Sequence, residues 1–407
     1  MDKKMQHTIL SGKKILLGVT GSIAIYKSLE LIRLFIKAGA EVKVVMSEDA
    51  KKFIAPLTFE TISQNKVLHT ETESWSEGLS HIHTGKWADI FLIAPASVNT
   101  INKLSHGIAD NLITQTAIAY AKTMVIAPSA NTNMMIHPIT KESLEKLTSL
   151  GYHIIAPQSK LLACNDEGVG ALAEVEDIFF YCARLLLKEL FWIDREVIVT
   201  GGGTIEKIDD VRCLSNFSSG KQALELAKAL FFKGANVTLI TSGEKPTTQY
   251  INHLHIRSSQ ELASALLAHM SRIKLAEKMP YLFMAAAVSD FIPLQTQHGK
   301  LKKEELGENY ALELKRNIDI LSSIPKKGFK VIGFKAEMDE TNALKNAQAM
   351  LEKKELDAVC LNILKTENTF GSNKNEISFI TPTLVQKCSL ASKFEIASHI
   401  VEHASHL

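Results

Sequence analysis

Hydrophobic residues along the chain form short continuous runs, and each run is followed by a segment with helical spacing. Residues 15–19 are one such apolar run, which is typical of a parallel strand buried on both faces. After Ser22, a residue that often begins helices, apolar side chains recur at helical spacing as far as Gly39. Residues 42–46 form a second run. This pattern predicts a strand–helix–strand unit.

The same opening recurs in the second half of the chain. Residues 196–242 contain a strand, a glycine turn, an amphipathic helix, a Gly-Ala stop and another strand. Here, however, about twenty residues separate the glycine turn from the helix, far more than in an ordinary strand-to-helix loop. A loop of this length in a compact unit is either disordered or functional.

Strands continue to alternate with helices through both halves, which predicts parallel sheets. The fold class is therefore α/β, with two doubly wound, mostly parallel-sheet, Rossmann-like domains. Charged residues at 188–189 and 194–195 interrupt the pattern between the two halves. We place the domain boundary there, giving domains 1–191 and 192–407.

Composition and charge narrow the class of protein. The chain has 407 residues, enough for two or three domains. Its 46 basic and 44 acidic residues leave a net charge of +2, which disfavours nucleic acid and anionic membranes as partners. The N-terminal segment lacks the long apolar stretch of a signal peptide, and no run is long enough to span a membrane. Five widely spaced cysteines exclude a disulfide scaffold and suit a reducing compartment, so a cytoplasmic enzyme is expected.

The first glycine turn is a candidate phosphate site. Gly18, Gly21 and Ser22 lie where a helix N-terminus would present backbone N–H groups to an anion. The spacing fits a dinucleotide fingerprint poorly, and the second strand ends in Met46-Ser47, where a hydroxyl suits a phosphate better than a ribose diol. A mononucleotide such as FMN is therefore favoured over NAD. The alternative is a tight turn that binds nothing.

Polar residues follow the next two strands at the edge where open α/β sheets bind ligands. Ala96, Ser97 and Asn99 follow one strand, Asn131 follows another, and His81 precedes the first of the two. Taken singly, Asn131 would be a turn-forming residue and His81 a surface or capping histidine.

Several motifs in this half are similar to those of the flavin-dependent cysteine decarboxylase family. They are GSIAIYK, GKWAD, HGIADNL, the PSAN turn and LAC-x-x-x-G-x-G. The resemblance implies a flavodoxin-like flavoprotein domain in which FMN oxidises the cysteine thiol of 4′-phosphopantothenoylcysteine, CO2 leaves and the enethiol is reduced. It implies acid–base catalysis by His81, binding of the substrate carboxylate by Asn131 and proton donation by Cys164. The FMN contacts that it implies are Gly21, Ser22, Ile23, Ala24, Ser47, Ala96, Ser97 and Asn99.

The chain departs from the family pattern in a segment expected to cover the substrate. Asn165 stands where the family has glycine, and Ala171 and Leu172 stand where it has arginine and methionine. These changes bear on how the flap closes, whereas His81, Asn131 and Cys164 are kept.

The long loop of the second half gathers polar residues just before a helix. They include Arg212, Asn216 and an SSGK segment that lacks P-loop spacing but can gather hydroxyls, a lysine and helical N–H groups around an anion. Further on, Asp290 follows an apolar strand, and Lys300, Lys302 and Lys303 cluster beyond it. A solvated loop and a solvated charged face are the alternatives.

DDVR-x-LSN-x-SSGK, AAAVSD, GKLKK, RNIDIL, VIGFKAE and FGSNKNE resemble phosphopantothenate–cysteine ligase. This resemblance implies that CTP activates 4′-phosphopantothenate as an acyl-cytidylate, which cysteine then attacks. Lys300 would stabilise developing charge, and Arg212 and Asn216 would contact the intermediate. Mg²⁺ is expected with the triphosphate, without assigned ligands. The implied CTP contacts are Ala285, Ala286, Asp290, Lys300, Ile318, Asp319, Ile320, Leu321, Phe334 and Lys354.

Two departures fall in the implied nucleotide pocket. Ile318 replaces a family proline, and Met350 replaces a lysine one helical turn before Lys354. They predict an active ligase whose nucleotide preference is weakened or altered.

The two resemblances cover nearly the whole chain in the order of the bifunctional coenzyme A biosynthesis protein family. That family implies small-molecule substrates and a homo-oligomer with trimeric flavin sites and dimeric ligase units, together a dodecamer. A flavin-binding regulatory relative without catalysis should have lost His81 or Cys164, and both are present. A plain flavin or nicotinamide oxidoreductase would leave the long loop and the lysine cluster unexplained.

Overall fold

The computed structural model describes residues 9–76, 78, 80–161, 167–273, 278–302, 308–365, 368–369 and 371–407. The chain forms two compact units, residues 1–187 and 188–407. The second unit thus begins at Lys188, close to the position where the charge pattern placed a boundary. Among the described residues, no helix combines the length and the apolar composition that crossing a membrane would need.

Unit 1 is built on a five-stranded sheet in the order β2-β1-β3-β4-β5, with every neighbouring pair parallel. This pairing confirms the predicted parallel sheet, and residues 15–19 are buried throughout, as expected for a strand covered on both faces. The strands are β1 Lys14–Val19, β2 Glu41–Met46, β3 Ile90–Ala96, β4 Thr123–Pro128 and β5 His153–Ile154.

The helices of unit 1 form two packed groups. In the first group, α1 contacts both α3 and α9. In the second group, α5 contacts both α6 and α8, and α4 contacts α6. Their bounds are η1 Ile23–Ile25, α1 Tyr26–Lys37, α2 Glu48–Lys51, α3 Pro56–Ser63, α4 His81–Trp87, α5 Val98–Ser105, α6 Leu112–Ala119, α7 Thr132–Ile136, α8 Pro138–Ser149 and α9 Val175–Leu187. A separate antiparallel hairpin joins β6 Gln158–Leu161 to β7 Glu167–Ala171.

Unit 2 contains an eight-stranded sheet in the order β12-β11-β8-β13-β16-β17-β18-β19. The pairs from β12 to β17 are parallel and the last two are antiparallel, so the sheet is mostly parallel as predicted. The strands are β8 Glu196–Gly201, β11 Asn236–Thr241, β12 Asn252–His255, β13 Tyr281–Met284, β16 Lys330–Glu337, β17 Ala358–Ile363, β18 Lys374–Ile380 and β19 Val385–Ser392. The helices are α10 Lys221–Phe232, α11 Ser259–Met270, α13 Ile320–Ser323, α14 Glu340–Lys353 and α15 Lys393–Ala404.

The strand predicted over residues 281–290 is shorter in the structure, because β13 ends at Met284. Beyond it, the regular pairing with β8 stops, and the chain bonds to the Thr200 side chain of β8 and to the loop that follows β8. Ala286 N donates to Thr200 Oγ1 at 3.2 Å, and Ala287 N donates to the Gly202 carbonyl at 2.8 Å. The apolar run therefore predicted the strand, but these tertiary bonds set its end.

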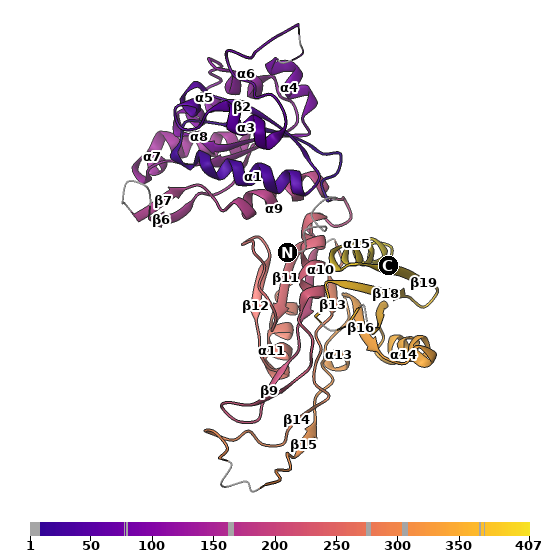
Figure 1. The fold of residues 1–407 in the computed structure, drawn as a ribbon. Coiled ribbons are helices and arrows are strands. Elements are labelled where there is room, and N and C mark those ends of the chain that lie inside the picture. The colour runs from indigo at the N-terminus through magenta and orange to yellow at the C-terminus, as the bar shows by residue number, and fades with distance from the viewer. Residues whose placement is uncertain are drawn as a thin grey trace. The chain divides into compact units, whose positions relative to one another are not determined.

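The long loop of unit 2 is ordered over its described residues and forms the hairpin β9 Ile205–Lys207 with β10 Cys213–Ser215. A second ribbon, β14 Phe291–Pro293 with β15 Leu314–Arg316, extends beside it away from the large sheet (Figure 1). Gln297 N donates to the Ile208 carbonyl at 3.0 Å and joins the two. We call these two ribbons together the arm.

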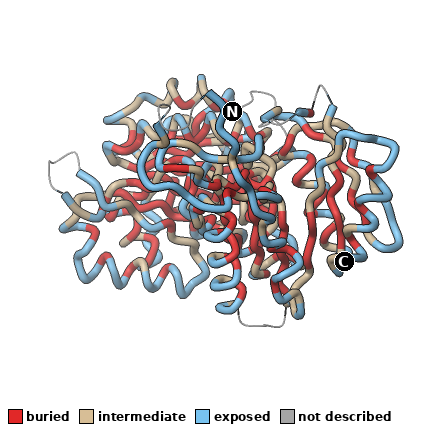
Figure 2. Tube along the Cα trace, turned by 90° about the horizontal axis from the view of Figure 1, so that it is seen from below, coloured by how far each residue is buried: buried red, intermediate tan, exposed pale blue. Residues whose placement is uncertain are grey.

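The core of each unit follows its central strands. Buried residues gather along the strands inside each unit, and the exposed ones follow the outer helices and loops (Figure 2). In unit 1, residues of β1 and β3 such as Leu16, Phe91 and Ile93 pack with α5, α6 and α8 residues in one apolar cluster. Burial of these side chains supplies most of the driving force for folding.

The replacement Leu92→Ala should lower the unfolding free energy of unit 1 by about 2–5 kcal/mol, because it leaves a cavity in the fully buried strand β3. Hydrogen exchange followed by mass spectrometry on peptides from β1 and β4 reports unit 1 separately. Leu150→Ala, at a position that is 63% exposed, is the matched control and should change exchange little. Equal effects of the two replacements would contradict the assigned core.

Candidate active sites

The carboxyl ends of four strands in unit 1 lead into residues that cap helices. Ser22 accepts from Ala24 N, Ser47 from Ala50 N, Ser97 from Thr100 N and Asn131 from Asn133 N. Since β1 to β4 are parallel, the four caps lie along one edge of the sheet. The structure thus brings together side chains that the sequence separates by more than one hundred positions.

These caps border a cavity of about 940 Å³. Of the predicted flavin and substrate contacts, those lining it are Gly21, Ser22, Ile23, Ala24, Ser47, Ser97, Asn99 and Asn131. The predicted contact Ala96 is not among the lining residues, because it is fully buried at the end of β3.

Two residues that sequence reasoning missed hold this edge together. Thr20, which is 1% exposed, donates from Oγ1 to the Pro95 carbonyl at 2.7 Å and accepts from Ser97 N at 2.8 Å. Ser129 accepts from the Ser22 hydroxyl at 3.2 Å. Both lie beside motif residues, but the sequence carries no signal of their cross-strand partners.

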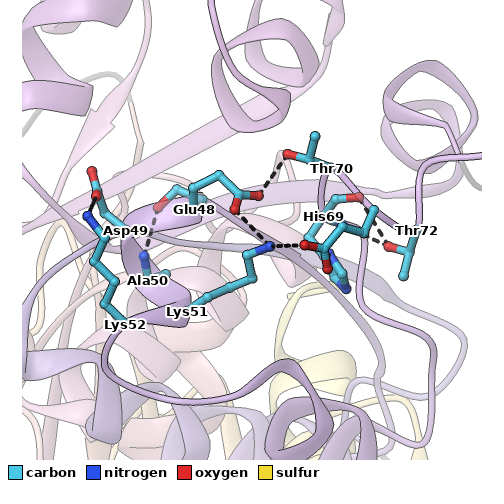
Figure 3. A network of polar contacts seen from close by, with 10 residues as sticks. Glu48, Asp49, Ala50, Lys51, Lys52, His69, Thr70 and Thr72 are labelled. Carbon is cyan, nitrogen blue, oxygen red and sulfur yellow. Dashed lines mark hydrogen bonds and ion pairs between the residues drawn. The ribbon is translucent and has the colours of Figure 1, made fainter.

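Gly21 is needed because α2 passes close to it. A Cβ at position 21 would lie 2.6 Å from Asp49 Cβ, and a short side chain offers no way to relieve that contact. Glu48 and Lys51 join their side chains at 2.8 Å, and Glu48 also accepts from the Thr70 hydroxyl at 2.8 Å (Figure 3). Hydrogen bonds from Lys51 and then Thr70 lower the pKa of the Glu48 carboxyl. These bonds fix α2 above the glycine turn.

The β6–β7 hairpin covers one side of the cavity and packs on the turn that carries Asn131. Ala130 N donates to the Gly170 carbonyl at 2.9 Å, and Gly170 has a φ of +155°. A Cβ there would lie 2.1 Å from the Ala130 oxygen. Lys160 of this hairpin forms an ion pair with Glu174. The two family departures Ala171 and Leu172 line the cavity.

Of the three predicted decarboxylase residues, Asn131 lines this cavity, His81 does not, and Cys164 falls outside the described residues. Cys164 and Asn165 lie outside the described residues, so the proposed proton donor stays a prediction. His81 is the first residue of α4 and does not line the cavity of its own chain. Its Nδ1 lies 2.7 Å from Glu73 Oε1.

Unit 2 has a cavity of about 860 Å³ at the carboxyl ends of its central strands. The predicted residues that line it are Asn216, Ala286, Asp290, Ile318, Asp319, Ile320, Leu321, Phe334 and Lys354. Met350, the departure from the family lysine, lines it as well. Most of the predicted nucleotide contacts are therefore adjacent in the structure.

Asp319 organises one wall of this cavity. It caps α13 by accepting from Ser322 N, and its carboxylate pairs with Lys354 Nζ at 2.9 Å. Burial acts to raise the pKa of the Asp319 carboxyl, but hydrogen bonds from Lys354 and Ser322 outweigh it and lower that pKa. Asn317, which sequence reasoning missed, ties the same turn to Ser289 through an Nδ2–H bond of 2.8 Å.

A smaller cavity of about 190 Å³ adjoins the 860 Å³ cavity of unit 2, and the two cavities share Ala286, Phe334 and Lys335. The predicted contact Ala285 lines this smaller cavity. The SSGK segment at the start of α10 lines it too, as predicted for an anion site, but sequence reasoning missed Lys393. Lys393 is 9% exposed and has no ion pair within 4 Å among the described residues, although the Glu225 carboxylate is near enough to favour its charged form. Burial, and then the nearby charge of Lys221, lower the pKa of the Lys393 ammonium to about 8.

Arg212 and Lys300 lie on the arm and line neither cavity. Asp209, buried beneath them, accepts from Arg212 N at 2.6 Å, Leu301 N at 3.1 Å and Arg212 Nη1 at 3.1 Å. Burial acts to raise the pKa of the Asp209 carboxyl, but hydrogen bonds from the backbone N–H groups of Val211, Arg212 and Leu301 outweigh it and lower that pKa. Lys300 directly precedes Leu301, so Asp209 bonds to Arg212 and to the backbone beside Lys300.

The structure assigns no magnesium ligands among the residues that it describes. Within the described part of the chain, no three His, Cys, Asp or Glu side chains gather in a way that could hold a metal ion.

Comparison with known proteins gives a match for each half. Residues 3–187 match the Flavoprotein family, and residues 192–407 match the DNA/pantothenate metabolism flavoprotein C-terminal domain. The chain is 36% identical over 398 residues to the coenzyme A biosynthesis bifunctional protein CoaBC of Haemophilus influenzae, covering 96% of this chain and 97% of the relative. It is 34% identical over 410 residues to that of Bacillus subtilis, with 98% of each covered.

Other relatives match less of the chain. A cysteine/cysteine sulfinic acid decarboxylase from an unknown prokaryotic organism is 37% identical over 365 residues, covering 86% of this chain and 98% of its own. A mutant PPC decarboxylase complexed with pantothenoylaminoethenethiol is 34% identical, with a TM-score of 0.39, and covers 43% of this chain and 97% of its own. A crystal structure of the C-terminal domain of CoaBC is 24% identical, with a TM-score of 0.43, and covers 53% of this chain and 97% of its own.

The replacement Gly21→Val should remove bound flavin, because its side chain would push α2 away from the glycine turn. We expect purified Gly21→Val to be colourless while it remains folded by circular dichroism. Gly85→Ala is the matched control, since a Cβ there makes only ordinary contacts of 3.6 Å or more. Full flavin content in Gly21→Val, measured by visible absorbance, would contradict this assignment of the cavity.

Proposed function

The chain belongs to the coenzyme A biosynthesis bifunctional protein family, and on this premise we propose that its two units catalyse successive steps on one substrate. Unit 2 would join 4′-phosphopantothenate to cysteine at the expense of CTP. Unit 1 would decarboxylate the product to 4′-phosphopantetheine. The observation that carries the proposal is that each family-matched half has a cavity at the carboxyl edge of its own sheet, lined by most of the ligand contacts predicted for that half.

FMN is the flavin that the first cavity fits. The glycine at position 21 lets α2 approach, and the hydroxyls of Ser22, Ser47 and Ser97 sit beside helix N-termini that favour a phosphate. When bound, FMN would supply reversible two-electron redox chemistry, so that oxidation of the substrate before CO2 leaves and reduction of the enethiol afterwards need no outside oxidant or reductant.

The residues of unit 1 would bind the substrate and move its protons. Asn131 at the cavity wall would hold the substrate carboxylate, and His81 would accept the thiol proton as hydride leaves. Cys164 would protonate the enethiol carbon. Since His81 does not line the cavity of its own chain, we infer that flavin sites are completed between copies, as the trimers implied by the family would allow.

Unit 2 would catalyse two successive nucleophilic substitution reactions. The phosphopantothenate carboxylate attacks the α-phosphorus of CTP and pyrophosphate leaves; the cysteine amine then attacks the acyl carbon and CMP leaves with the electron pair. Asp290, Phe334 and Lys354 would surround the cytidine, while the phosphates would point to the smaller cavity at the start of α10. Mg²⁺ would be held mainly by the phosphates and water.

The arm suggests how the ligase site is completed. Asp209 bonds to Arg212 and to the backbone beside Lys300, and both cations lie outside the cavities of their own chain. We infer that they reach the site of a second copy, where their charges would stabilise acyl-cytidylate formation. Dimeric ligase units and trimeric flavin sites together give the dodecamer.

A second candidate for unit 1 is decarboxylation of free cysteine or cysteine sulfinate. The relative named for that activity favours it, and the cavity wall differs from the family pattern at Ala171 and Leu172. Formation of the corresponding amine from free cysteine in the absence of CTP would indicate this second candidate.

Incubation of the purified protein with phosphopantothenate, cysteine and CTP should yield phosphopantothenoylcysteine and then 4′-phosphopantetheine, measured by mass spectrometry. Met350 and Ile318 line the nucleotide cavity in place of the family lysine and proline, so the preference for CTP should be weaker. Replacing CTP with ATP or UTP should therefore slow pyrophosphate release by this enzyme less than it slows release by a ligase that has the family residues. The absence of pyrophosphate release with all three nucleotides would exclude the ligase function.

The replacement Lys393→Met should weaken CTP binding roughly tenfold or more, since it removes a charged partner of the phosphates. It should also raise the thermal midpoint of unfolding at pH 7, because it removes a buried unpaired charge. In the wild type, CTP binding should weaken as the pH rises through about 8 and the ammonium loses its proton.

Lys387→Met, at an exposed position on β19, is the matched control and should change neither quantity. Tight CTP binding by Lys393→Met in equilibrium dialysis would overturn the assignment of the smaller cavity to the phosphates.

A further inference from the structure

Glu73 makes a double contact with the residue proposed as the decarboxylase base. Its Oε1 lies 2.7 Å from His81 Nδ1 and also accepts from His81 N at 3.4 Å. Both side chains are about four-fifths buried, with 18% exposure for His81 and 22% for Glu73. A contact this short and this sheltered from water holds an imidazole far better than an exposed ion pair would.

Contacts that do not involve His81 fix the backbone around Glu73. Leu68 pairs with β2 as a short parallel bridge, with hydrogen bonds of 2.9 Å to Val44 and Met46. The chain then turns at the buried His69, whose carbonyl accepts from Glu73 N at 3.0 Å. Glu73 therefore projects from a segment that is anchored to the central sheet.

The turn that precedes Glu73 is also joined to a wall of the flavin cavity. Thr72 Oγ1 accepts from His69 N at 3.0 Å and donates to the Val67 carbonyl at 2.7 Å. Thr70 of the same turn donates to Glu48 on α2, which lines the cavity (Figure 3). The position of Glu73 is thus tied to the position of α2.

The carboxylate decides which imidazole nitrogen carries the proton. An ionised Glu73 can only accept hydrogen bonds, so Nδ1 of His81 must be the protonated nitrogen in the neutral ring. Nε2 is then left with its lone pair, which is the form that a base requires. When Nε2 takes a proton, the carboxylate also stabilises the imidazolium, as in other carboxylate–histidine pairs.

The remaining surroundings of His81 add no competing charge among the described residues. Trp75 packs its ring edge-on against the imidazole at 5.4 Å between centroids. Helix α6, which contacts α4, carries no charged residue. Lys14 of β1 lies over Trp87, at the other end of α4.

We propose that Glu73 is a positioning residue for His81, fixing its tautomer and ring orientation so that Nε2 accepts the substrate thiol proton while the thiol-bearing carbon gives its hydride to the flavin. This role rests on the proposed decarboxylase function. It assigns to the segment between β2 and α4 a task that none of the sequence motifs indicated.

The test is the rate of flavin reduction by phosphopantothenoylcysteine, followed by rapid mixing with the full-length flavin-loaded enzyme. Glu73→Gln keeps the size but loses the charge, and it should slow flavin reduction about 10- to 100-fold while KM stays within about twofold. Glu73→Asp keeps a carboxylate and should recover part of the rate. Glu71→Gln removes an exposed carboxylate two positions away and should behave like the wild type.

A double-mutant cycle with His81→Ala separates positioning from a general structural effect. If Glu73 acts through His81, Glu73→Gln should cost nothing further in the His81→Ala background. Flavin content should be unchanged in every variant. Equal losses in both backgrounds, or a full rate in Glu73→Gln, would overturn the role of Glu73 alone, whereas a wild-type enzyme that never reduces its flavin with this substrate overturns the proposed decarboxylase as well.

Discussion

Parallel pairing of the central strands is the constraint on which both candidate sites depend. In a parallel sheet all carboxyl ends face the same edge, and each strand must there turn into a helix whose first N–H groups lack partners. In unit 1, hydrogen bonds from these N–H groups are accepted by the side chains of Ser22, Ser47, Ser97 and Asn131. The side chains that satisfy the helix ends are therefore also the side chains that line the cavity.

Both units secure this edge in a similar way, with buried threonine hydroxyls that cross from one strand end to the next. Thr20 bridges the ends of β1 and β3 in unit 1. In unit 2, Thr200 accepts from Ala286 N and Thr204 accepts from Ser289 N at 3.1 Å. A hydroxyl can donate and accept at once, so a single side chain satisfies backbone groups that the sheet leaves unpaired.

The residues proposed as catalytic that lie away from the cavities share another feature: a buried or half-buried carboxylate bonds to each of them or to the backbone beside it. Glu73 holds His81, and Asp209 holds both Arg212 and the backbone beside Lys300. Such pairing fixes the direction of a charged or titratable group before any substrate arrives, which lowers the cost of organising the site. It is consistent with these groups acting across an interface between copies, where their own sheet cannot position them.

The sequence by itself determined the apolar strands, the glycine turns, the hydroxyl caps and the family motifs, because each depends on neighbours within a few residues. It also indicated most of the residues that line the two large cavities. Only the tertiary structure decided that β13 ends at Met284, that Lys393 enters the phosphate-sized cavity and that Glu73 meets His81. These contacts depend on strand register and on where loops return to the sheet, and hydrophobic periodicity carries no information about pairs so far apart along the chain.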